Sequence, residues 1–175
     1  MRVNKKTIIF IDSGDTIVDE GTEQRDEKGI VIHAGLVPGA KEILQTLHER
    51  DYIIAMVADG EERSFANTYE ENGLGHCFTT RTISEIVGVQ KPAREMFQDA
   101  MEKNSLSDED KERIIMVGNN LKKDIVGANR FGITSVLLDW SPRYNMTPSG
   151  KEDQPDYVIH HPLDLLELVS RLDKE

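Results

Sequence analysis

The sequence Ile8-Ile9-Phe10-Ile11-Asp12-Ser13-Gly14-Asp15-Thr16-Ile17 places a carboxylate directly after a short apolar run. A continuous apolar run that stops at a turn signal is typical of a strand buried on both faces, as in a parallel sheet. Ligands of open α/β sheets bind beyond the carboxyl ends of such strands. Asp12 is therefore the first candidate for a functional side chain.

The rest of the chain alternates between apolar runs and segments with helical spacing. The runs predict strands at residues 7–11, 53–57, 114–117, 135–138 and 157–159. Between them, apolar residues recur at helical spacing around Leu44, Phe97, Ala128 and Leu166. Because parallel strands need right-handed crossovers, this order predicts an α/β fold with a three-layer, doubly wound (Rossmann-like) parallel sheet. We expect residues 1–175 to form one domain.

Two stretches lack a clear period, residues 18–36 and 141–156. In the first, Asp26-Glu27-Lys28-Gly29 precedes the β-branched Ile30-Val31-Ile32, a pattern that predicts a small hairpin. Neither stretch is long enough to form another domain.

Composition excludes several classes of function. The net charge of −11 disfavours binding to nucleic-acid backbones or anionic membrane surfaces. No apolar run approaches the roughly 18 residues that would span a bilayer, and no secretory signal follows the N-terminus. The single cysteine, Cys77, cannot form an internal disulfide, and we expect it to be a buried apolar residue. We expect a cytoplasmic protein.

Two further stretches that follow the first along the chain also carry candidate functional residues. Gly88-Val89-Gln90-Lys91-Pro92 places a lysine before a proline that suits the first turn of a helix. The run Ile114-Ile115-Met116-Val117 continues into Gly118-Asn119, and Asp124 follows five residues later. With Asp12 and Thr16, these stretches resemble the motifs of the haloacid dehalogenase (HAD)-like hydrolase superfamily.

The resemblance implies a mechanism and a set of site residues. Asp12 would be the nucleophile that forms an aspartyl-phosphate, and Lys91 would neutralise the nucleophile and the transferred phosphoryl group. A Mg²⁺ cofactor would be held by the Asp12 carboxylate, the Gly14 carbonyl, Asn119 and Asp124. Asp124 has a second reading, in which it orients Lys91. The backbone of the segment Ala58-Asp59-Gly60, together with Lys91, would bind the substrate phosphate.

Three positions depart from the family pattern. Gly14 replaces the aspartate that protonates the leaving oxygen and activates water, a contribution of about 10²–10⁴-fold. Ala58 replaces a phosphate-binding Ser or Thr, and Asn119 replaces a carboxylate, which weakens Mg²⁺ binding. Asp15 is a candidate substitute acid, although neighbouring side chains of an extended segment point oppositely.

We therefore expect a Mg²⁺-dependent phosphohydrolase that is slow or needs a good leaving group. One alternative is a non-catalytic module that binds a phosphorylated ligand or a protein, and a lesser one is a haloacid dehalogenase, in which halide leaves without a proton. The segment between Thr16 and Pro38 is too short for a full cap domain, so the site would be open to phosphorylated small molecules or macromolecules. Trp140, Arg143 and Tyr144 either frame the mouth of this site or pack on the surface.

Overall fold

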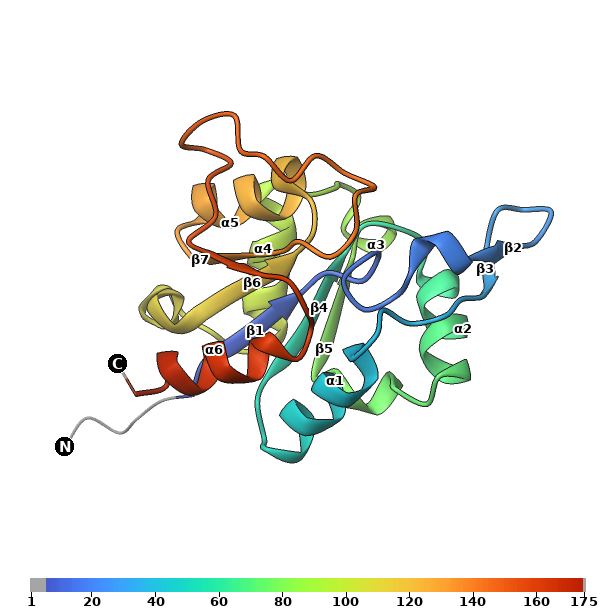
Figure 1. Ribbon diagram of the computed structural model, residues 1–175, viewed down its shortest axis with the longest axis horizontal. Helices are drawn as coiled ribbons and strands as arrows, with labels where there is room; N and C mark the ends of the chain where they lie inside the picture. The colour runs from blue at the N-terminus through green and yellow to red at the C-terminus, as the bar shows by residue number, and fades with distance from the viewer. Residues whose placement is uncertain (1–5, 175) are drawn as a thin grey trace.

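A six-stranded parallel sheet forms the centre of the computed structural model, which describes residues 6–174 (Figure 1). Its strands are β1 (Ile8–Ile11), β4 (Ile54–Ala58), β5 (Thr80–Ile83), β6 (Ile114–Gly118), β7 (Thr134–Leu138) and β8 (Tyr157–Ile159). They pair in the order β5-β4-β1-β6-β7-β8, with every neighbouring pair parallel. The predicted doubly wound α/β sheet is confirmed.

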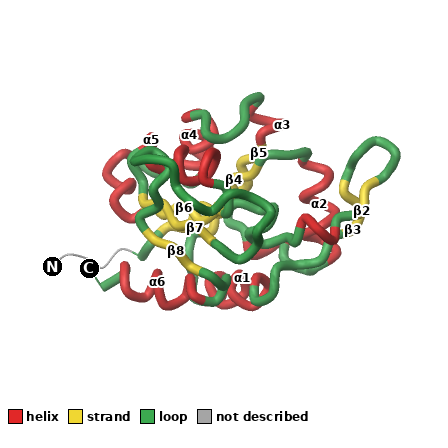
Figure 2. Tube along the Cα trace, turned by 45° about the horizontal axis from the view of Figure 1, so that its top comes forward, coloured by secondary structure: helices red, strands yellow, loops and turns green. Residues whose placement is uncertain are grey.

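The helices cover both faces of this sheet (Figures 1 and 2). They are η1 (Glu20–Thr22), α1 (Ala40–Glu49), α2 (Glu62–Glu71), η2 (Gly75–Cys77), α3 (Ser84–Val87), α4 (Arg94–Lys103), η3 (Asp108–Arg113), η4 (Leu121–Ile125), α5 (Val126–Phe131) and α6 (Asp164–Leu172). Helices α1 and α6 pack on one face, while α4 and α5 pack on the other. The result is the expected three-layer arrangement.

Strand β1 lies between β4 and β6, and all four of its side chains are buried. Ile9 and Ile11 join the core under α1 and α6, whereas Ile8 and Phe10 join the core under α4 and α5. This division follows from the alternation of side chains along a strand. It explains why the run is apolar throughout, and it fixes the position at which Asp12 leaves the sheet.

Strand β5 is the one strand of the six-stranded sheet that the sequence did not predict. Its residues, Thr80-Arg81-Thr82-Ile83, are mostly polar, and it lies at the edge of the sheet, where only β4 pairs with it. An edge strand needs fewer buried side chains than a central one, so its sequence carries a weaker apolar signal.

Smaller differences concern the ends and faces of helices. Helix α4 begins at Arg94, so Pro92 precedes the helix instead of lying in its first turn. In α6 the buried residues are Leu165, Leu168 and Val169, while Leu163 and Leu166 are only partly buried. Cys77 is buried as expected.

The predicted hairpin is present as β2 (Gln24–Arg25) and β3 (Val31–His33) and lies beside α2 (Figure 2). The Val31 backbone N–H donates to Ser64 Oγ at 3.0 Å, and Asn67 Nδ2 donates to Val31 O at 2.9 Å. In the described chain, η1 and this hairpin are the only regular elements between β1 and α1, so no full cap domain is inserted there.

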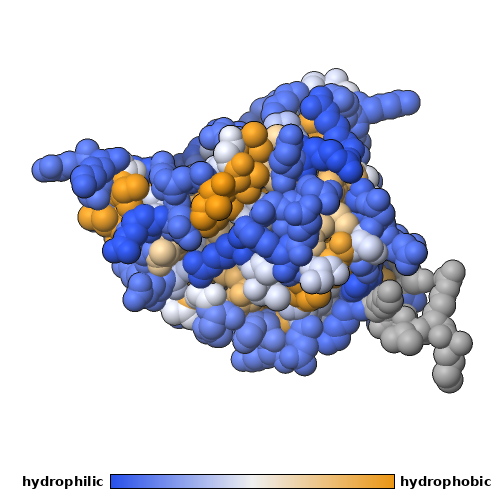
Figure 3. Space-filling model, turned by 180° about the vertical axis from the view of Figure 1, so that it is seen from behind, coloured by the Kyte–Doolittle hydropathy of each residue, from blue (hydrophilic) through white to orange (hydrophobic). Residues whose placement is uncertain are grey.

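The face of the molecule seen in Figure 3 is mostly hydrophilic, with a few apolar patches. Ile32, Ile86 and Val89 are among the large apolar residues that are exposed. Among residues 6–174, none of the helices combines the length and the apolar character that a membrane span requires.

Asp173, just after α6, joins the last helix to the start of β1. It accepts hydrogen bonds from Thr7 N and Oγ1, both at 2.7 Å, and from Tyr52 Oη at 2.6 Å. Burial opposes ionisation, but these donors outweigh it and lower the pKa of Asp173 below its ordinary value. A carboxylate with a lowered pKa stabilises the fold above the unfolded-state pKa and loses that effect as the pH falls.

We therefore expect Asp173→Asn to lower the free energy of unfolding by about 2 kcal/mol at pH 7. The difference from wild type should shrink as the pH falls below about 4. Urea denaturation at several pH values measures this, with Glu109→Gln on the exposed side of η3 as the control. A difference that stays constant from pH 7 to pH 3 would contradict it.

Candidate active site

The Lys91 ammonium joins two carboxylates at the carboxyl end of the sheet. Its Nζ donates to Asp12 Oδ1 at 2.8 Å, to Asp124 Oδ1 at 2.7 Å and to Val57 O at 2.7 Å. Lys91 is only 3% exposed. The three motifs found in the sequence therefore meet at one atom, as the resemblance implied.

Sheet register brings these residues together. Ile11 pairs with Met56 of β4 and with Val117 of β6, so the three strands end within two residues of one another. The Asp12 backbone N–H then donates to Val117 O at 2.9 Å, which extends the pairing by one residue. Asp12 consequently leaves the sheet between its two central neighbours.

The electrostatics of this cluster keep Lys91 charged. Burial disfavours an ammonium, but the adjacent Asp12 and Asp124 carboxylates outweigh this cost and raise the pKa of Lys91 above its ordinary value. Burial and the charge of Asp12 raise the pKa of Asp124, and the contact with Lys91 opposes that rise. Lys91 is therefore a fixed positive charge beside the predicted nucleophile.

Asp124 acts through Lys91 in this conformation. Its Oδ1 accepts from Lys91, and its Oδ2 accepts from the Asn120 backbone N–H at 3.1 Å. A Cβ at position 118 would lie 2.2 Å from Asp124 Oδ2, so Gly118 is the residue that allows this close approach. Of the two readings of Asp124, the contacts favour orientation of Lys91 over direct contact with a metal.

The remaining predicted ligands have the chemistry that Mg²⁺ needs. A backbone carbonyl at Gly14, the Asp12 carboxylate and the Asn119 amide oxygen are all hard oxygen donors. Asn119 is buried, and its Nδ2 has no hydrogen-bond partner among the described residues. No group of three or more His, Cys, Asp or Glu side chains within residues 6–174 is arranged to hold a metal. The donor set therefore fits a weakly held Mg²⁺ and not a tight acidic cage.

The predicted phosphate-binding segment 58–60 already makes contacts of its own. Asp59 Oδ1 accepts from the Lys91 backbone N–H at 3.0 Å, and Asp59 Oδ2 accepts from Lys123 Nζ at 2.9 Å. The Gly60 N–H donates to Ser84 Oγ at 2.9 Å. Ala58 is buried at the end of β4. A phosphate at Gly60 would have to share or replace the Ser84 contact, so this binding role stays a prediction.

Asp15 is held away from a catalytic role. Its side chain is completely buried, and it accepts from the Glu20 backbone N–H at 3.0 Å and from the Arg143 guanidinium. Trp140 Nε1 donates to Asp15 O. Arg143 and Trp140 thus hold the turn after β1 in place. The suggestion that Asp15 replaces the acid missing at Gly14 is wrong for this conformation.

A pocket of about 90 Å³ lies beside the turn after β1 and is lined by Ser13, Gly14, Glu20, Gly60 and Ser64, among others. Tyr144 Oη donates to Glu20 Oε2 at 3.1 Å. Burial, followed by the charges of Asp15 and Asp12, raises the pKa of Glu20, although Tyr144 opposes this. Sequence reasoning missed Glu20, because it lies in the irregular segment 18–36 and no motif marks it.

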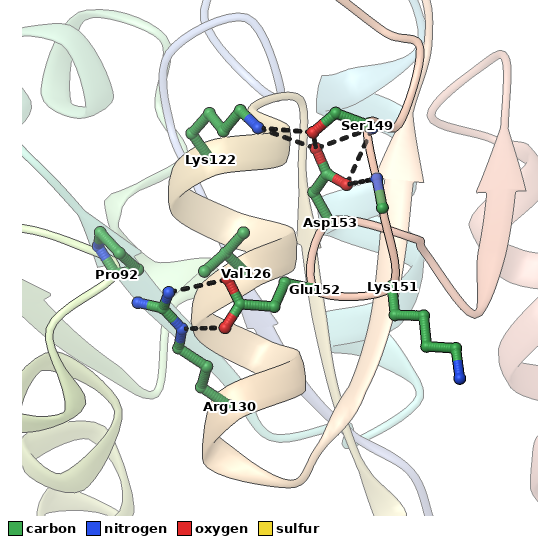
Figure 4. A pocket seen from close by; sticks show the side chains of 9 residues that line it. Pro92, Lys122, Val126, Arg130, Ser149, Lys151, Glu152 and Asp153 are labelled. Atoms are coloured by element: carbon green, nitrogen blue, oxygen red, sulfur yellow. Dashed lines mark hydrogen bonds and ion pairs between the residues drawn. The ribbon is translucent and has the colours of Figure 1, made fainter.

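A larger pocket lies away from Asp12, between η4, α5 and the segment 149–153 (Figure 4). Its charged side chains are largely paired: Lys122 Nζ lies 2.9 Å from Asp153 Oδ2, and Arg130 Nη2 lies 2.9 Å from Glu152 Oε2. These pairs fasten the segment 141–156 to α5. The same segment carries Arg143 and Tyr144 back over the turn after β1.

The sequence profile of the haloacid dehalogenase-like hydrolases matches residues 15–138, which is more than half of the chain. The chain belongs to this family. It is 36% identical over 103 residues to a glyceraldehyde 3-phosphate phosphatase of Methanopyrus kandleri, with 59% of this chain and 43% of that protein covered. It is 34% identical over 139 residues to a ribulose-1,5-bisphosphate 5-phosphatase of Halopiger xanaduensis, with 77% of this chain and 57% of that protein covered.

The haloacid dehalogenase-like chain thus spans about half the length of these curated relatives. Among solved structures it resembles the HAD-hydrolase YfnB from Bacillus subtilis, which was crystallised with magnesium. The TM-score is 0.66 at 25% identity, and the match covers 77% of this chain and 56% of that chain. The resemblance inferred from the three motifs is therefore confirmed.

Removing the Lys91 ammonium should destabilise the protein strongly, because Asp12 and Asp124 would remain as buried like charges. We expect Lys91→Met to lower the free energy of unfolding by about 3–5 kcal/mol. Lys103→Met is the matched control, since Lys103 pairs with Asp99 at 2.8 Å on the surface and should cost less than about 1 kcal/mol. Equal losses in the two variants, measured by urea denaturation, would contradict a special role for the buried charge.

Proposed function

We propose that this protein is a phosphohydrolase that transfers a phosphoryl group to Asp12 and then to water. The observation that supports this most is the Lys91 ammonium, which is held between Asp12 and Asp124. A fixed cation at the nucleophile is what phosphoryl transfer requires, because charge accumulates on the transferred group. The phosphatase names of the relatives point the same way.

Each residue of the site has a separate role in the proposed reaction. Asp12 Oδ1 is bound by Lys91, and its other carboxylate oxygen is left to attack phosphorus. Lys91 neutralises Asp12 and the transferred phosphoryl group, while Asp124 holds Lys91 in place. Asp12, the Gly14 carbonyl and Asn119 would hold Mg²⁺, which would supply further positive charge for the phosphate oxygens. Ala58, Asp59 and Gly60 would border the phosphate.

The substrate class follows from the openness of the site. With no cap between β1 and α1 of the described chain, small phosphorylated metabolites and phosphorylated macromolecules both have access to Asp12. The names of the relatives favour a phosphorylated small molecule. Gly14 and Asn119 are the reason to expect slower turnover than in a family member with both carboxylates.

The test is a panel of phosphomonoesters, including an aryl phosphate with a good leaving group, assayed with and without Mg²⁺. We expect Mg²⁺-dependent release of phosphate by wild type and a loss of more than about 10³-fold in Asp12→Asn. Asp139→Asn is the matched control, because Asp139 follows β7 at the same edge of the sheet with its side chain 41% exposed. It should keep wild-type activity.

The other outcomes of this test point to the alternatives. Halide release from a 2-haloacid without phosphate release would indicate a dehalogenase. A wild type that turns over neither class, and that traps no beryllium fluoride at Asp12, would indicate a non-catalytic binding module. Equal phosphatase activity in wild type and Asp12→Asn would overturn the assignment of the nucleophile.

A further inference from the structure

The Glu20 carboxyl group occupies the space beside Gly14. A Cβ at position 14 would lie 2.0 Å from Glu20 Oε1 and 2.9 Å from Glu20 Cδ. Real Cβ atoms essentially never approach other atoms this closely, so a side chain at position 14 would require the flexible end of Glu20 to move; in this conformation the Glu20 carboxyl group fills that volume. The two residues are six positions apart, and they reach the same point from opposite ends of the turn after β1.

Several contacts hold Glu20 in this place. Its backbone N–H donates to Asp15 Oδ1 at 3.0 Å, which fixes the start of η1. Its Oε2 accepts from Tyr144 Oη at 3.1 Å. Among the described residues, Oε1 has no hydrogen-bond partner, and Glu20 lines the pocket of about 90 Å³ together with Ser13 and Gly14, the two residues that follow Asp12. One oxygen is anchored by Tyr144, and the other lies beside Gly14.

We propose that Glu20 supplies the proton-transfer group that Gly14 lacks. This inference rests on the proposed phosphohydrolase function and names a further catalytic residue for it. The argument is one of placement: Glu20 Oε1 lies where a side chain at position 14 would begin. Because Glu20 starts from η1 and not from position 14, its carboxyl group reaches this point through a longer side chain than that of an aspartate.

The two steps then balance. Asp12 forms a bond to phosphorus as the bond from phosphorus to the leaving oxygen breaks, and that oxygen takes the proton of the Glu20 carboxyl group. The resulting Glu20 carboxylate next accepts a proton from water as the water oxygen attacks phosphorus. The bond between phosphorus and Asp12 breaks. Inorganic phosphate is released, and the Asp12 carboxylate and the protonated Glu20 carboxyl group are restored.

The neighbouring acidic side chains already form hydrogen bonds or ion pairs with other residues. Asp15 is buried against Arg143, and Asp59 accepts from Lys91 N and Lys123 Nζ. Glu23 lies 2.6 Å from Arg25. Of these acidic residues around the turn, Glu20 is the one whose oxygen reaches the side-chain position of Gly14.

A series of leaving groups tests the proposal. For Glu20→Gln, kcat/KM toward an alkyl phosphate should fall by about 10²–10⁴-fold, because the alkoxide must be protonated as it leaves. For p-nitrophenyl phosphate, whose leaving group needs no proton, kcat/KM should stay within about threefold of wild type. Turnover of this ester should show a burst of nitrophenolate, since the aspartyl-phosphate accumulates without a base to activate water. Glu23→Gln is the matched control and should keep the wild-type profile.

The second part of the test moves the acidic group from position 20 to position 14. Gly14→Asp alone should be poorly active because its side chain meets Glu20, whereas Gly14→Asp with Glu20→Ala should recover alkyl-phosphate activity at least tenfold over Glu20→Ala alone. If Glu20→Gln does not fold, this recovery decides the question.

A loss in Glu20→Gln that is equal for all leaving groups, or no loss at all, would overturn the role of Glu20 while Asp12→Asn remains inactive. Failure of the exchange to recover any activity would overturn it as well. Activity that survives in Asp12→Asn, or is absent from wild type, overturns the phosphohydrolase proposal and this inference with it.

Discussion

One buried ammonium organises the functional end of this protein. Lys91 donates to Asp12, to Asp124 and to the Val57 carbonyl, so it links the ends of β1 and β4 to the start of η4. A buried charge is tolerated only when its partners are held in good geometry. This requirement accounts for the glycine at position 118 and for the Asn120 amide that fixes the second oxygen of Asp124.

A second set of contacts joins the turn after β1 to the segment 141–156. Charge pairs fasten this segment to η4 and α5, and from that base Arg143 reaches Asp15 while Tyr144 reaches Glu20. These partners are more than a hundred residues apart in the sequence. The turn after β1 is therefore shaped by the far end of the chain.

The sequence predicted the parts of the structure that depend on local pattern. Central strands such as β1 and β6 are buried on both faces and are apolar throughout, so they were recognised, whereas the edge strand β5 has a polar sequence and was not. The meeting of Asp12, Lys91 and Asp124 followed from the spacing of motifs. The position of Glu20 did not, because it depends on a side-chain conformation within an irregular turn and on Tyr144 from a distant segment. The contact that fixes Asp15 was not predictable for the same reason, since its partner Arg143 carries no local signal.

The close approach of Glu20 to Gly14 also has an evolutionary meaning. Because one volume cannot hold two side chains, an acid at position 14 and the Glu20 carboxyl group in its present place exclude each other. Among related chains with this turn, we expect that an acid at position 14 is accompanied by a shorter residue at position 20.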